Sequence, residues 1–192
     1  MKRSLSILAL AAAAACAPGL AQAQSTIRAV ASGPAESPPN GSPGSSVATF
    51  VIDGTTMTAE VPFQDLLAGT TMAHIHCCTT SAFAGVAPIA IPFTDFPLGV
   101  TSGTYSQSFD LTDAAVFAPD FLAAYGGTPA SASAALIDAI VANEAYLNIH
   151  TSLYPAGEIR GFMVAAIPEP ATWGMLGMGL AGLGMMARRR RA

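Results

Sequence analysis

Short runs in which polar and apolar residues alternate are the feature that most limits the folds open to this chain. In residues 57–63 the apolar members are Met57, Ala59, Val61 and Phe63, which is the period of a strand with one buried face. Residues 47–52 precede this run, and Asp53-Gly54 between them is typical of a tight hairpin turn. We therefore expect an antiparallel hairpin, with Pro62 placing its second strand at a sheet edge.

The same reasoning predicts five further strands, at residues 72–77, 86–91, 104–111, 146–151 and 158–164. Residues 112–144 are instead predicted to be a helical insertion that packs on an edge. Thr112 is a candidate N-cap there, Pro119 divides the first helix, and Leu136, Ile137, Ile140 and Val141 form the apolar stripe of the second. This pattern predicts a mainly β domain, an antiparallel sandwich or barrel with Greek-key-like connections.

The first 23 residues have the features of a Sec signal peptide. Lys2 and Arg3 precede an apolar run, and Ala21-Gln22-Ala23 is a typical cleavage site. We expect the Sec translocon and signal peptidase to act here, so that Cys16 is discarded and the chain is exported.

The last 25 residues contain a second targeting segment. Residues 171–187 carry no charge, and as a helix they would be about 25 Å long, enough for a short membrane span. Arg188, Arg189, Arg190 and Arg191 follow, which places this end in the cytoplasm. Such a segment is either a signal that sorts the protein to its destination or an ordinary single-span membrane anchor.

Pro168-Glu169-Pro170, an apolar helix and an arginine cluster, in this order, resemble the PEP-CTERM sorting signal. The resemblance implies a Gram-negative bacterium that produces exopolysaccharide. It also implies transient anchoring in the inner membrane and cleavage by an exosortase. The protein would then reach the cell surface or the medium.

Residues 24–167 are long enough for one domain with its own core. They hold eleven of the twelve acids but only two basic residues, Arg28 and Arg160, giving a net charge of −9. This charge argues against nucleic acid as a partner. Dinucleotide-binding, P-loop, serine-hydrolase and zinc-protease motifs are all absent from the sequence.

The three histidines lie in two of the predicted strands. Alternation puts His74 and His76 on one face of their strand, and His150 with Asn148 on one face of another. In the last strand Glu158 and Arg160 share a face. If these strands are neighbours, we expect all these side chains on a single outward face, although a one-residue slip would reverse any of them.

Glu36-Ser37-Pro38-Pro39, "AHIH" and "YLNIHT" followed by "GEIRG" together resemble the chordin-type (CHRD) domain over most of residues 26–164. The resemblance implies a β-rich extracellular binding module that is not an enzyme. The positions matching its motifs, beyond the histidines, are Asn148, Thr151, Gly157, Glu158, Arg160 and Gly161. Cys77-Cys78 departs from the pattern, in which small residues commonly follow the histidine pair.

Three interpretations of His74, His76 and His150 remain open. In the first, they hydrogen-bond across neighbouring strands in a purely structural role. In the second, they bind copper or zinc, because a His-x-His pair and a third histidine offer three imidazoles on one side of a sheet. In the third, they belong to a metal-free binding surface for protein or polysaccharide.

After removal of Cys16, the two remaining cysteines are adjacent. Adjacent Cα atoms lie about 3.8 Å apart, closer than in most disulfides, yet free thiols rarely persist in an oxidising compartment. The alternatives are a vicinal Cys77–Cys78 ring, thiolate ligands for a soft metal, and intermolecular bridges. We favour the ring.

The sequence thus predicts a signal peptide (1–23), a CHRD-like domain (24–167) and a sorting segment (168–192). The expected function is non-catalytic binding or structure at the cell surface or in the exopolysaccharide matrix. Exopolysaccharide or cell-surface proteins are the expected partners, and copper and zinc are candidate cofactors, neither of them certain. The alternative is a copper- or zinc-binding extracytoplasmic protein, for which copper would also allow redox activity.

Overall fold

The computed structural model describes residues 24–166. The predicted signal peptide, the Pro168-Glu169-Pro170 motif, the predicted span at 171–187 and the arginines at 188–191 lie outside these residues. Within residues 24–166, the helices are too short or too polar to cross a membrane.

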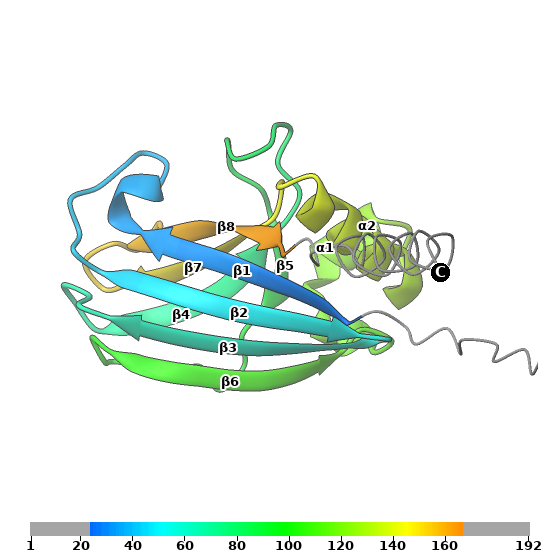
Figure 1. The fold of residues 1–192 in the computed structure, drawn as a ribbon, viewed down its shortest axis with the longest axis horizontal. Helices are drawn as coiled ribbons and strands as arrows, with labels where there is room; N and C mark the ends of the chain where they lie inside the picture. Colours follow the sequence, from blue (N-terminus) through cyan, green and yellow to red (C-terminus); the bar gives the residue numbers. More distant parts are fainter. Residues whose placement is uncertain (1–23, 167–192) are drawn as a thin grey trace, which may run out of the picture.

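Eight antiparallel strands form one curled half-barrel sheet in the order β5-β4-β7-β8-β1-β2-β3-β6 (Figure 1). The strands are β1 (Ser25–Ser32), β2 (Ser45–Asp53), β3 (Thr56–Gln64), β4 (Thr70–His76), β5 (Ile89–Pro92), β6 (Gly103–Asp110), β7 (Tyr146–Thr151) and β8 (Ile159–Ala165). The prediction of a mainly β, antiparallel fold is therefore confirmed, and the half-barrel consists of a single sheet.

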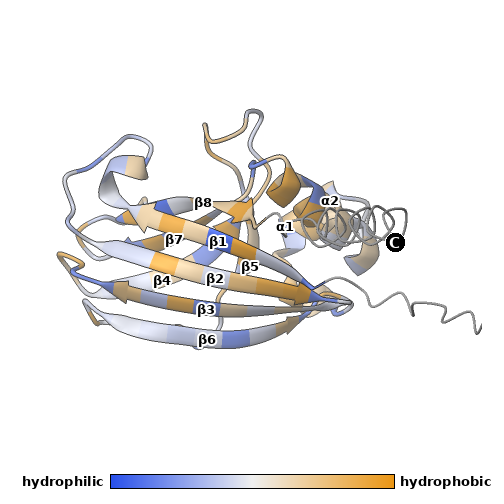
Figure 2. Cartoon of the chain, viewed as in Figure 1, coloured by the Kyte–Doolittle hydropathy of each residue, from blue (hydrophilic) through white to orange (hydrophobic). Residues whose placement is uncertain are grey.

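The predicted hairpin is present as β2 and β3, whose last paired residues are Asp53 and Thr56. The edge position predicted from Pro62 is wrong, because β3 lies between β2 and β6. Pro62 pairs with Thr104 of β6, and the register with β2 is interrupted beside it, where a ladder would need the amide hydrogen that proline lacks. The true edges are β5 and β6, and much of β6 is hydrophilic (Figure 2).

The sequence prediction missed β1, which occupies the middle of the sheet between β8 and β2. Its inward residues are Ile27, Ala29 and Ala31, all fully or nearly fully buried, and they alternate with exposed Arg28 and Val30. The alternation was therefore present, but alanine gives little hydrophobic contrast to a periodicity argument.

The helical insertion consists of a 3₁₀ turn, η2 (Ala114–Val116), and the helices α1 (Pro119–Ala124) and α2 (Pro129–Val141). Asp113 caps η2 through the Ala115 amide, so the predicted Thr112 cap is wrong. Pro119 begins α1 and does divide the segment as predicted, because its missing amide hydrogen is not needed in a first turn. Leu136 and Ile140 face the core, whereas Val141 is exposed.

The hydrophobic core fills the inner face of the curled sheet. Phe50, Met57, Ile75, Leu147, Ile149 and Met163 are among its fully buried side chains. Each contributes about 1.5–3 kcal/mol by leaving water. Phe93, just after β5, stacks on Tyr105 and Phe109 of β6, which links the two edges of the sheet. The opposite, outer face of β4, β7 and β8 carries the three histidines, Asn148 and Arg160.

Candidate functional site, a three-histidine cluster

The strand register brings the histidines together. β7 lies between β4 and β8, with His74 opposite Asn148, and Asn148 opposite Arg160. His150 is opposite Met72, which lies two residues before His74 in β4. Because side chains alternate between faces, the imidazoles of His74, His76 and His150 all lie on the outer face.

The three imidazoles form a compact group. One ring nitrogen from each histidine lies within 4.8 Å of the others. The ring centroid of His74 lies 4.5 Å from that of His150 and 4.7 Å from that of His76. His74 is 4% exposed and His150 6%, while His76 is partly buried.

Backbone carbonyls orient two of the rings. The Nδ1 atom of His76 lies 2.7 Å from the Ala87 carbonyl oxygen, and that of His150 lies 2.9 Å from the Pro155 carbonyl oxygen. A carbonyl oxygen can only accept a hydrogen bond, so in the neutral rings Nδ1 carries the hydrogen and Nε2 carries a lone pair. Those Nε2 atoms, and both nitrogens of His74, are buried and have no hydrogen-bond partner among residues 24–166.

Burial lowers the pKa of all three histidines. The pKa of His74 falls to about 3, first because of burial and then because charges on His150 and His76 would repel its own. All three rings are therefore neutral at pH 7. Neutral imidazole is the form that binds metal ions.

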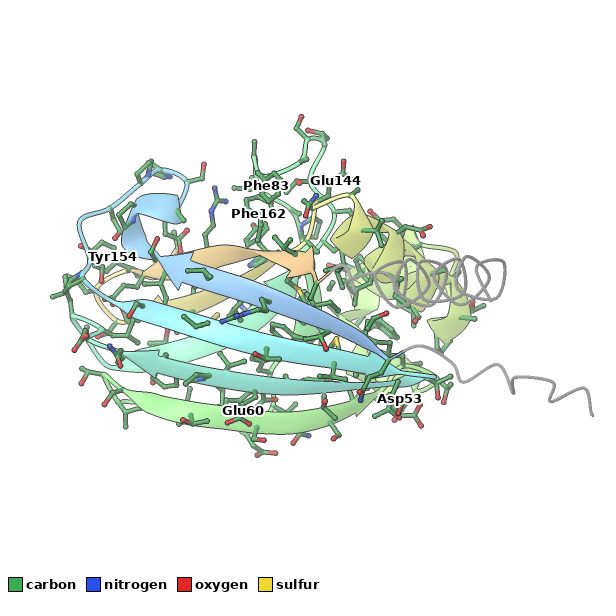
Figure 3. All side chains as sticks on the ribbon, in the orientation of Figure 1. Asp53, Glu60, Phe83, Glu144, Tyr154 and Phe162 are labelled. Carbon is green, nitrogen blue, oxygen red and sulfur yellow. A yellow bond between two sulfur atoms is a disulfide. The ribbon has the colours of Figure 1, made fainter. Side chains whose placement is uncertain are left out.

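The sequence predicted that the histidines and Arg160 share an outward face, and two loops cover that face. The first loop, residues 33–44, connects β1 to β2, and the second, residues 77–88, connects β4 to β5. Arg160 donates a hydrogen bond to the Ala35 carbonyl of the first loop and another, at 2.8 Å, to the Gly85 carbonyl of the second. Phe83 of the second loop packs edge-on against Phe162 of β8 (Figure 3), their centroids 5.8 Å apart. The cover explains why polar residues on the outer face are buried.

Glu158 does not share the face of the histidines, which corrects the alternation argument. Its amide donates to the Ile149 carbonyl at 2.8 Å, although the register partner of Ile149 is Ile159. Two residues therefore oppose one, as in a β-bulge, and the alternation shifts by one position. The Glu158 carboxylate instead accepts a hydrogen bond from Thr151, which points to the inner face.

The remaining motif residues shape the surroundings of the cluster. Asn148 is buried between His74 and Arg160 in the register. Gly157 has φ 127°, and a Cβ there would lie 2.6 Å from Asn148 Oδ1. Gly161 leaves room for the Val30 backbone of β1. Within residues 24–166, none of these three residues forms a hydrogen bond with an imidazole nitrogen.

Tyr146 is a neighbour of the cluster to which the sequence assigned no role. Its ring stacks on that of His76, with centroids 4.7 Å apart, and Arg160 Cζ lies 5.1 Å from its centroid. Alternation in residues 146–151 puts Tyr146 on the same face as His150, and its position beside the cluster could have been predicted from this pattern. The Ala87 and Pro155 carbonyls left no signal, because backbone groups do not depend on residue type.

Cys77 and Cys78 are joined by a disulfide. Cys77 belongs to the buried core, and Cys78 Sγ lies 3.8 Å from the Ala135 carbonyl oxygen of α2. Both sulfur atoms are therefore turned toward the inner face and the helices. They do not join the histidines.

Comparison with protein-family models gives two matches. The CHRD domain model matches residues 27–163, and the PEP-CTERM protein-sorting motif matches residues 166–191. Searches of curated proteins and of solved structures found no match. The sorting motif implies export, transient anchoring in the membrane and sorting by an exosortase. The chain therefore belongs to the CHRD domain family and is an exosortase-sorted extracellular protein.

Proposed function

We propose that this CHRD domain is a non-catalytic binding module of the cell surface or exopolysaccharide matrix, and that it holds a copper or zinc ion between His74, His76 and His150. One observation carries the metal proposal. Three imidazoles, two buried and one partly buried, converge within 4.8 Å, and the ring nitrogens that face one another have no partner among the described residues. A buried polar atom without a partner is costly, so such a cluster needs a compensating ligand.

The hydrogen bonds around the cluster support the same proposal. Histidines that bind metals usually donate their second ring hydrogen to a carbonyl or carboxylate, which fixes the tautomer. His76 and His150 do this through Ala87 and Pro155. If His76 and His150 were purely structural, we would instead expect their Nε2 atoms to form hydrogen bonds across neighbouring strands.

A bound ion would join β4 to β7 and hold the covering loop at Ala87. Because it binds the folded domain, an ion at one hundred times its dissociation constant would stabilise the fold by about 2.7 kcal/mol. Its role would thus be to hold an exported domain together, with chemistry on a substrate not required.

Metal analysis of the secreted domain, purified without a histidine tag, tests this proposal. We expect one equivalent of copper or zinc in the wild-type protein and a higher melting temperature when that ion is added. His76→Ala and His150→Ala should lose both effects. Thr58→Ala, an exposed change on a distant strand, is the control. If the wild-type domain takes up neither ion and the histidine variants are merely less stable, the histidines are structural.

We also propose an extracellular partner for the loop-covered face. Phe83 is 57% exposed and lies against Phe162 (Figure 3). An exposed aromatic ring next to a second one favours a binding surface, and exopolysaccharide is the partner that the sorting route brings closest. Co-sedimentation with the exopolysaccharide of the source cells, comparing wild type with Phe83→Ser, should show a loss of binding. Equal binding by both proteins argues against this surface.

A further inference from the structure

We propose that the three-histidine centre binds copper as Cu(I) in preference to Zn(II), and that the Met72 thioether is the donor that makes this choice. The inference rests on the metal-binding function proposed above and goes on to identify the ion. It is carried by the position of Met72, the charge of the surroundings and the chemistry of the donors.

Met72 lies on the same face as the histidines, at a position from which its side chain can reach the cluster. It is the register partner of His150 across β4 and β7, and it precedes His74 by two residues on the same face. Side chains directly opposite one another on antiparallel strands have Cβ atoms about 4.5–5.5 Å apart, well within reach of a methionine. Met72 is also 49% exposed, so its thioether is not committed to the core and keeps its rotamer freedom.

The charge around the centre favours a monovalent ion. Among the described residues, no carboxylate or thiolate joins the three neutral imidazoles. The Cys77–Cys78 disulfide faces the helices, and the cation of Arg160 lies 5.1 Å from the centre of the Tyr146 ring, which stacks on His76. Because the cost of burying an ion rises with the square of its charge, a dication costs about four times as much as a monocation here.

The donor set points to the same ion. Thioether sulfur is a soft ligand that selects Cu(I), while imidazole accepts both copper and zinc. Zn(II) in a structural site is almost always bound by four protein ligands, commonly including thiolate. Three neutral nitrogens alone would also suit Zn(II) with a water as fourth ligand, whereas the addition of a thioether favours Cu(I).

Competition titrations test the inference. The secreted domain is titrated anaerobically with Cu(I), held in ascorbate, against a chromogenic Cu(I) chelator, and separately with Zn(II) against a zinc indicator. We expect tighter Cu(I) than Zn(II) binding, and Met72→Leu should weaken Cu(I) binding about tenfold and leave Zn(II) binding within about twofold. Thr71→Ala, at the exposed neighbouring residue, should change neither affinity.

A second variant is the control for Cu(I) binding by the cysteines. Reduction of the disulfide would release thiolates that bind Cu(I) themselves, so Cys77→Ser/Cys78→Ser must keep the wild-type preference. Failure to bind either metal overturns the proposed function itself. Tighter binding of Zn(II), or an equal loss of both metals in Met72→Leu, overturns only the Cu(I) inference and leaves a metal site in place.

Discussion

At the scale of single residues, the Glu158 carboxylate holds together segments that are far apart in the sequence. It is fully buried and accepts hydrogen bonds from Ser42 Oγ at 2.5 Å, from the Leu67 amide at 2.6 Å and from Thr151 Oγ1 at 2.6 Å. Three donors compensate for the lost hydration of one charge. Its place in the family motif therefore follows from folding and needs no ligand.

Replacing Glu158 should be severely destabilising. Glu158→Ala leaves two buried donors and one partly buried donor without an acceptor, and we expect a loss of about 3–5 kcal/mol in the free energy of unfolding. Glu60→Gln, on the exposed face of β3, is the control and should change stability by less than about 0.5 kcal/mol. Urea unfolding measures both. Similar stabilities for the two variants would contradict this role of Glu158.

Glu36 should make stability fall as pH rises. Burial raises its pKa from 4.5 to about 7, against the lowering effect of Arg160 at 4.0 Å. Between these two values the folded protein keeps a proton that the unfolded chain has released, so ionisation favours unfolding. The shift corresponds to at most about 3 kcal/mol, fully developed above pH 7.

Melting temperatures of wild type and Glu36→Gln, measured from pH 4 to pH 8, isolate this effect. The variant should gain stability relative to wild type as pH rises through the window from 4.5 to 7. The buried histidines work in the opposite direction, because their lowered pKa values cost stability below about pH 6.5, but they act equally in both proteins. Parallel curves would show that the pKa of Glu36 is the same in the folded and unfolded protein, and would contradict the raised value.

At the scale of elements, the pairing of β1 with β8 depends on close approach of their backbones. A Cβ on Gly161 would collide with the carbonyl group of Val30 in β1. We expect Gly161→Ala to cost more than about 2 kcal/mol, because backbone would have to move. Gly41→Ala is a matched control, since nothing lies within 4 Å of its Cβ position. Chemical unfolding of both variants measures the difference, and equal stability would place β1 further from β8.

The strands and loops also differ in how well the sequence predicts them. Seven strands were found because bulky apolar residues such as Phe63 and Ile149 marked the inner face. Strand β1 was missed because alanines mark its face weakly. The histidine cluster followed from alternation, but Glu158 did not, because a bulge has no simple residue code. The covering loops could not be predicted, since Arg160 contacts them through the backbone carbonyls of Ala35 and Gly85, which do not depend on residue type.

At the scale of the whole molecule, the domain and the sorting motif are adjacent. The family match of the domain ends at residue 163, and that of the motif begins at residue 166. We predict that cleavage near Pro168-Glu169-Pro170 releases the domain. Mass spectrometry of the secreted protein should then find no peptide containing Trp173. Replacing the three motif residues with alanine should keep the protein in the membrane fraction, and a secreted form that retains Trp173 would contradict exosortase cleavage.

The sheet order has a consequence for the timing of export. Strands β5, β4, β7 and β8 form one half of the sheet and β1, β2, β3 and β6 the other, and only the pairing of β1 with β8 connects the two halves by a ladder. The first strand of the domain must therefore wait for the last to complete this pairing. Strand β8 ends at Ala165, directly before the matched sorting motif. The domain can close only when nearly all of the chain has crossed, so the last folding step and the arrival of the sorting segment at the membrane coincide.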